Sequence, residues 1–216
     1  LPKHACVKEE NRSVTFPSML ASNKRDRDLK RLTDQELMDL VQAGDFTPAS
    51  EIYDRYSKRV YNYSYRFLLD REAAEDATQE VFVKMMRHAN QFRSGATLLT
   101  WLLAITGNHC RDQLRSLRKR PVHGEDGLEL VPASDEASPE RQLQRHDTQR
   151  IVQEALTLLS ADQREAIVLS RYEGCTYAQI ALISGCSEGA VKTRVFRAMN
   201  VLKKALTGDA QETTNA

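Results

Sequence analysis

The stretch GCSEGAVKTRVFRAMNVLKKAL, residues 185–206, has the pattern of a glycine-containing turn followed by an amphipathic helix. Ser187 is a residue type that commonly caps a helix N-terminus. On a helical wheel, one narrow apolar arc is expected to face a core: Val191, Val195, Ala198 and Leu202. The opposite side carries Lys192, Thr193, Phe196, Arg197 and Asn200. A large aromatic beside an arginine on the exposed side indicates a binding surface.

The residues just before this helix predict a second, shorter one. TYAQ at residues 176–179 has the spacing of a capping box, and the helix it opens is expected to end near Ser184. Two short helices joined by a tight turn with glycine are typical of the helix-turn-helix motif. The second helix of that motif lies in the major groove of DNA. A surface helix that only contacts water is the alternative.

On that helix the exposed side chains suit DNA. Arg197 carries a fork of donors that matches the two acceptors of guanine, and Thr193 can donate or accept. Phe196 can contact a thymine methyl group or a sugar. Three further basic residues are candidates for phosphate contacts: Arg194, Lys203 and Lys204.

Helix signals also dominate the rest of the chain. Capping boxes are predicted at TDQE (residues 33–36) and SADQ (residues 160–163), which would open helices to about Ala43 and Tyr172. Thr47 followed by Pro48 predicts an N-cap with proline at the first helical position. Asp70 is expected to cap another helix, with an inward stripe of Ala74, Ala77, Val81 and Met85. Residues 98–119 and about 140–159 read as two more helices.

The composition changes between residues 120 and 140, where RPVHGEDGLELVPASDEASPE combines prolines, glycines and acidic residues without helical period. A segment of this kind is longer than most connections within a compact domain. We therefore expect an all-α chain of two small helical domains joined by a flexible linker, the second domain being a helix-turn-helix. The predicted divisions are a leader 1–28, a domain 29–120, a linker 121–139, a domain 140–208 and a tail 209–216.

Composition limits the classes of function. The chain has 216 residues, 41% of them hydrophobic and 28% charged, with a net charge of +1, which fits a soluble protein. No apolar run approaches the length of about 20 residues that a membrane span needs. The four cysteines, Cys6, Cys110, Cys175 and Cys186, are scattered without CxxC spacing. We expect reduced thiols, a cytoplasmic location, and neither metal nor cofactor.

Two charged regions stand out in the first half. Glu72, Asp76 and Glu80 recur every fourth residue, with Gln79 beside them. Like charges at this spacing repel, so the acidic side either serves solubility or meets a basic partner.

The helix at residues 98–119 has the opposite charge at its end, which carries Arg111, Arg115, Arg118, Lys119 and then Arg120. Such an end suits a phosphate backbone. The loop before it contains Asn90, Phe92 and Arg93, residue types that can hold an unstacked base. Trp101 is expected to pack in the core instead.

Two blocks of the sequence resemble a known family. AEDATQEVFVKMMRHANQFRSGATLLTWLLAITGNHCRDQLR, residues 74–115, resembles region two of the bacterial extracytoplasmic-function sigma factors. LSADQREAIVLSRYEGCTYAQIALISGCSEGAVKTRVFRAMNVLKKAL, residues 159–206, resembles their region four. Both blocks occur in the family's order with a variable linker between them. The chain departs from the family pattern at Ala104 and Gly107, where relatives often carry arginine.

The resemblance implies a promoter-specificity factor that binds core RNA polymerase, with a probable anti-sigma factor as a further partner and no small-molecule substrate. The residues implied for polymerase binding are Asp76, Gln79 and Glu80. Those implied for the minus-ten element are Asn90, Phe92, Arg93, Asn108, Arg111 and Arg115. Those implied for the minus-thirty-five element are Lys192, Thr193, Phe196 and Arg197.

Two rival functions fit the sequence less well. A helix-turn-helix regulator acting without polymerase would leave the acidic side at residues 72–80 without a role. An enzyme would need a phosphate-binding glycine loop, a nucleophile motif or a metal cluster, and the sequence shows none of these. We expect no catalytic activity.

Overall fold

The computed structural model describes residues 29–93, 95, 97–119 and 151–212, and in these residues the chain is helical, with no β-strand. The predicted leader and linker lie outside the described residues, as does most of the helix expected at 140–159, of which residues 151–157 are seen as helical. The fold class is therefore all-α, as the sequence predicts.

The N-terminal helices are α2 (Asp34–Gln42), α3 (Ala49–Leu68), α4 (Arg71–Arg87), the short 3-10 helix η1 (Ala89–Gln91) and α5 (Leu98–Lys119). The predicted capping box at Thr33 and the predicted cap at Asp70 are both formed. The prediction for α3 was wrong by one residue. Pro48 is the N-cap and makes no side-chain cap, while the Thr47 amide donates to the Asp45 carboxylate at 2.9 Å.

The C-terminal helices are α7 (Ala161–Ile167), the π-helix η2 (Val168–Tyr172), α8 (Tyr177–Ser184) and α9 (Glu188–Glu212). Capping boxes at Ser160 and Thr176 are formed as predicted, and the Ser187 hydroxyl accepts from the Ala190 amide. The helix predicted to reach Tyr172 does so, but its last turn widens into a π-helix. The last helix continues to Glu212, beyond the end predicted for the second domain.

Helix α8 ends at Gly185, which has a left-handed backbone (φ 62°). A side chain disfavours this conformation, so the glycine allows the sharp reversal between α8 and α9. The two helices contact each other directly across this turn. The helix-turn-helix predicted from the sequence is therefore present.

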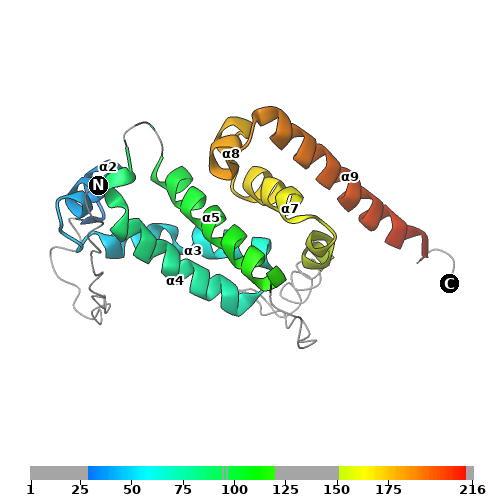
Figure 1. Cartoon of the computed structure of the whole chain (residues 1–216), viewed down its shortest axis with the longest axis horizontal. Coiled ribbons are helices and arrows are strands. Elements are labelled where there is room, and N and C mark those ends of the chain that lie inside the picture. Colours follow the sequence, from blue (N-terminus) through cyan, green and yellow to red (C-terminus); the bar gives the residue numbers. More distant parts are fainter. Residues whose placement is uncertain (1–28, 94, 96, 120–150, 213–216) are drawn as a thin grey trace, which may run out of the picture.

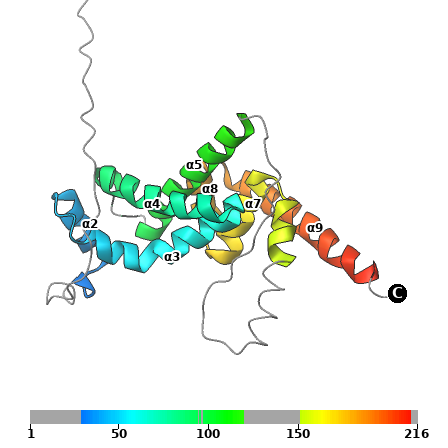
Figure 2. The same ribbon diagram turned by 90° about the horizontal axis from the view of Figure 1, so that it is seen from below.

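The buried side chains form two main clusters. One lies among α2, α3, α4 and α5 and includes Leu37, Ile52, Val81 and Leu102. The other includes Leu169, Ile180, Val191 and Val195 from the C-terminal helices, and also Tyr63, Leu69 and Leu103 from the N-terminal half. Helices α7, η2 and α8 therefore pack on α3 and α5, and α9 packs on α7 and α8 before its C-terminal part extends beyond them (Figures 1 and 2).

Candidate nucleic-acid interface

The helix-turn-helix presents the predicted side chains outward. Lys192, Thr193, Phe196 and Arg197 are exposed on α9, and Phe196 retains 67% of its accessible surface. The apolar arc behind them is turned inward, with Val191, Val195 and Ala198 buried and Leu202 partly buried. The exposed side of α9 therefore combines basic side chains with one large apolar ring. This surface is therefore suited to a partner that offers both phosphates and apolar groups.

Thr193 and Arg194 on α9 have partners within the protein. The Thr193 hydroxyl donates to the Gly189 carbonyl at 3.0 Å. Arg194 donates to the Asp162 carboxylate at 2.8 Å and to the Cys186 sulfur at 3.3 Å. The suggestion that Arg194 contacts phosphate is not supported by this geometry, because its guanidinium ties α9 to the first turn of α7.

The loop before α5 divides its predicted residues between surface and core. Asn90 and Arg93 are exposed, but Phe92 is only 5% exposed and packs against Trp101 with ring centroids 5.4 Å apart. The Gln42 amide donates to the carbonyls of Ala89 (3.0 Å) and Phe92 (3.2 Å). Helix α2 thus holds the loop in place. Gln42 gave no signal in the sequence, because its partners are backbone atoms 47 and 50 residues away.

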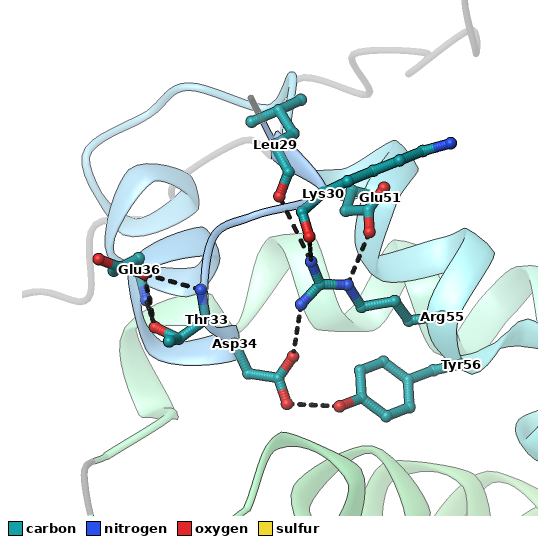
Figure 3. A network of polar contacts seen from close by, with 8 residues as sticks. All are labelled: Leu29, Lys30, Thr33, Asp34, Glu36, Glu51, Arg55 and Tyr56. Atoms are coloured by element: carbon teal, nitrogen blue, oxygen red, sulfur yellow. Dashed lines mark hydrogen bonds and ion pairs between the residues drawn. The ribbon is translucent and has the colours of Figure 1, made fainter. Parts of the chain in front are cut away.

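Helix α2 is itself fastened to α3 by a polar network (Figure 3). The Tyr56 hydroxyl donates to Asp34, and Arg55 bonds the same carboxylate at 3.1 Å. Arg55 also donates to Glu51 (2.7 Å) and to the carbonyls of Leu29 and Lys30. Burial and the Asp34 carboxylate raise the pKa of Tyr56 to about 12.

The basic residues of α5 lie in different surroundings. Asn108 and Arg115 are exposed, and Arg115 pairs with Asp112 at 3.3 Å. Arg111 is partly buried, donating to Asn108 at 2.5 Å and to Glu165 of α7. Arg118, Lys119 and Arg120 lie where the structure describes no side chains. Glu165 had no signal in the sequence, because a lone acidic residue in a helix is usually exposed.

The acidic side of α4 is exposed as the spacing predicts. The exposed side of α4 carries Glu72, Asp76, Gln79 and Glu80. The opposite side of the helix is buried and carries Ala74, Ala77, Val81 and Met85. Beside them a groove opens between α3 and α4, lined by Tyr53, Ser57, Lys58, Tyr61, Glu75, Thr78 and Gln79. The surface combines carboxylates with aromatic edges, which suits a protein partner carrying basic side chains.

The described residues show how the potential metal ligands and two of the thiols are placed. In the part of the chain it describes, no three His, Cys, Asp or Glu residues gather around one point. Burial raises the pKa of the Cys110 thiol to about 12 and also raises that of Cys175. Both are therefore thiols rather than thiolates at neutral pH. Among the described helices, none has the length and apolar composition to span a bilayer.

Comparison with known protein families identifies both halves. The sequence profile "Sigma-70 region 2" matches residues 52–120, and "Sigma-70, region 4" matches residues 149–202. The RNA polymerase sigma-H factor of Pseudomonas aeruginosa is 33% identical over 180 residues, which cover 80% of this chain and 93% of that protein. The ECF RNA polymerase sigma-E factor of Haemophilus influenzae is 30% identical over 184 residues, covering 82% and 97%.

Solved structures agree with the fold. The sigma factor RpoE from Bartonella quintana, solved with the anti-sigma factor NepR, superposes with a TM-score of 0.61 at 29% identity, covering 73% of this chain and 96% of that one. CnrH, solved with the cytosolic domain of CnrY, has the same TM-score at 23% identity, covering 82% and 98%, and supports the fold alone.

The chain therefore belongs to the extracytoplasmic-function group of the sigma-70 family. It is a sigma factor, the subunit that directs core RNA polymerase to promoters to initiate transcription.

Proposed function

We propose that this sigma factor divides its contacts among three surfaces. The α8–α9 helix-turn-helix contacts the minus-thirty-five element. The loop before α5 contacts the minus-ten element, together with the side of α5 that carries Asn108, Arg111 and Arg115. Helix α4 contacts core polymerase. The observation that carries the proposal is the outward set on α9, in which Phe196 is 67% exposed among basic side chains.

For the upstream element the proposed readers are Lys192, Thr193, Phe196 and Arg197. All four are exposed on one side of α9. Arg197 can form two hydrogen bonds to guanine, and Lys192 can neutralise a phosphate. The Thr193 hydroxyl already donates to Gly189, so its lone pairs are what remain to accept from a base or a water.

For the minus-ten element the proposed direct contacts are Asn90, Arg93, Asn108, Arg111 and Arg115. Phe92, the sixth residue predicted for this element, is proposed to act through the loop, since its ring packs on Trp101. Capturing an unstacked base offsets the cost of opening the duplex. The factor thus promotes melting by binding energy, and we propose that it has no catalytic activity of its own.

For polymerase the proposed contacts are Asp76, Gln79 and Glu80. Their exposure on one side of α4, beside the groove between α3 and α4, supports a basic protein partner. We further propose a cytoplasmic location and control by an anti-sigma factor. The latter is supported by the 29%-identical sigma factor whose structure was solved with NepR.

The test is reconstitution with purified core polymerase on fragments of the source genome, followed by mapping of the transcript starts. We expect transcription start sites that appear only when the protein is added. The DNA upstream of these sites should share one minus-ten and one minus-thirty-five element. A preparation that is folded by circular dichroism, yet neither co-elutes with core polymerase nor directs any start, would contradict the proposal. DNA binding without polymerase association would instead favour the stand-alone regulator.

A further inference from the structure

A buried ionic cluster joins the two halves of the molecule. Glu165 of α7 is 1% exposed and accepts hydrogen bonds from Arg111 of α5 and, at 3.0 Å, from Tyr63 of α3. Arg111 also donates to the Ile183 carbonyl of α8 at 3.2 Å. A buried carboxylate is unfavourable unless it is paired. The cluster therefore stabilises only the arrangement in which α7 lies against α5.

Gly107 has no side chain, and this leaves room for the Glu165, Tyr63 and Arg111 side chains to meet beside α5. A Cβ atom at residue 107 would lie 2.9 Å from the Glu165 Oε1, 2.9 Å from the Tyr63 hydroxyl and 3.2 Å from the Arg111 Nη1. Real Cβ contacts are not as close as 2.9 Å, so a side chain at residue 107 would displace the ends of the Glu165, Tyr63 or Arg111 side chains and disturb the ionic cluster.

A second group of contacts ties α3 to η2 and α7. Arg59 pairs with Glu173 at 2.9 Å and donates to its carbonyl at 3.1 Å. The Arg66 guanidinium lies 4.3 Å from the centre of the Tyr172 ring. Arg164, partly buried, donates to the Phe67 carbonyl at 2.9 Å. Together with the shared apolar cluster, these contacts hold the two halves against each other.

The same side of α5 carries residues proposed for the minus-ten element. Arg111 donates to Glu165, Asn108 and Ile183 through its two Nη atoms, and the Glu165 carboxylate neutralises the charge of its guanidinium. A carboxylate and a phosphate are both anions that require these donors. A DNA phosphate that takes the same Nη donors would displace the Glu165 carboxylate.

We propose that this sigma factor has a self-blocked closed form, in which α7 and α8 dock on α5 and the Glu165 carboxylate takes the place at Arg111 that DNA takes in the open form. The inference rests on the proposed role of Arg111 in DNA binding. Apparent DNA affinity is reduced by the fraction of molecules that are open. Core polymerase would then favour the open form by separating the two halves.

The experiment uses the full chain with two variants, Gly107→Ala and Glu165→Gln. Gly107→Ala places a methyl group in the interface and favours helix α5 itself. Glu165→Gln removes the charge and keeps the shape. Glu75→Gln is the matched control, because Glu75 makes an exposed pair with Arg71 on α4, away from the interface. Circular dichroism confirms that helicity is retained.

Two measurements are made on each protein. Small-angle X-ray scattering without DNA reports the separation of the halves, and fluorescence anisotropy reports binding of a labelled random-sequence single-stranded 25-mer. We expect both interface variants to show a larger radius of gyration than wild type and the control. Opening a form that is nine-tenths closed lowers the apparent dissociation constant about tenfold.

The outcomes separate the two proposals. Unchanged dimensions in both variants would overturn the closed form, and expansion without tighter DNA binding would overturn its blocking role. Arg111→Ala in the Gly107→Ala background tests the DNA contact itself. Expansion with DNA binding that is indifferent to Arg111 would contradict the minus-ten assignment while leaving the closed arrangement supported.

Discussion

At the scale of single residues, α9 illustrates how position separates roles for chemically similar side chains. Arg194 and Arg197 lie on the same helix, three residues apart. Arg194 bonds Asp162 and fastens α9 to α7, whereas Arg197 is exposed on the outward side beside Phe196. Only an arginine whose donors face outward can read base edges. The helical wheel separates these two because it places Arg194 on the flank.

Replacing Arg197 by alanine is expected to cost about 1–3 kcal/mol in discrimination between a matched and a mutated upstream element. The loss arises because a bidentate contact to guanine disappears while phosphate contacts remain. The measurement is run-off transcription from the two templates. Arg171→Ala removes an exposed arginine from η2 and serves as the control, with unchanged discrimination expected. Equal discrimination by the Arg197→Ala protein and wild type would refute the assignment.

At the scale of elements, local capping and turn geometry set where each helix begins and ends. The reversal after α8 depends on Gly185 in the left-handed region at φ 62°. The network of Asp34, Arg55 and Tyr56 then fastens α2 onto α3, and α2 in turn holds the minus-ten loop through Gln42. Both features connect a local conformation to the position of a proposed DNA contact.

Gly185→Ala is expected to destabilise the protein by about 1–2 kcal/mol, since an L-residue is forced into the left-handed conformation. A Cβ there meets nothing within 4 Å, so the cost comes from the backbone alone. Gly189→Ala is the matched control: it lies inside α9 without a positive φ, and its Cβ would approach only Ser187, at 3.9 Å. Urea unfolding should show a lower free energy of unfolding for the first variant, and an equal or higher one for the second.

The contact between α2 and α3 predicts a pH dependence. The pKa of Tyr56 is raised in the folded protein to about 12, above the ordinary value of about 10. A raised pKa contributes stability that is fully present below pH 10 and is lost as the pH rises toward 12. The difference in free energy of unfolding between wild type and Tyr56→Phe should therefore shrink over that interval. A difference that is constant from pH 8 to pH 11.5 would exclude a role for Tyr56 ionisation.

At the scale of the whole molecule, the proposed polymerase and upstream-DNA surfaces lie on different elements, α4 and α9, which do not pack extensively on each other in the described residues. Substitutions far apart and without shared partners usually act additively. The two halves can therefore be tested separately in one protein.

Asp76→Lys combined with Glu80→Lys is expected to weaken co-elution with core polymerase by at least about tenfold in affinity, because like charges across a contact surface cost several kcal/mol. Binding to an upstream-element duplex should stay at the wild-type level. Asp112→Lys, a charge reversal on the exposed side of α5, is the control for general effects of added positive charge. Retained co-elution of the double variant would remove α4 from the polymerase surface.

The sequence by itself determined the helices, their caps at Thr33, Asp70, Ser160 and Thr176, and the inward and outward sides of α9. These depend on contacts within three or four residues, which a periodic pattern records directly. Only the tertiary structure decided that Phe92 is buried against Trp101, that Gln42 holds the loop, and that Glu165 pairs with Arg111. Those contacts join residues that lie far apart along the chain or on different sides of a loop. Their geometry is set by how whole helices pack, and no local pattern of residues encodes it.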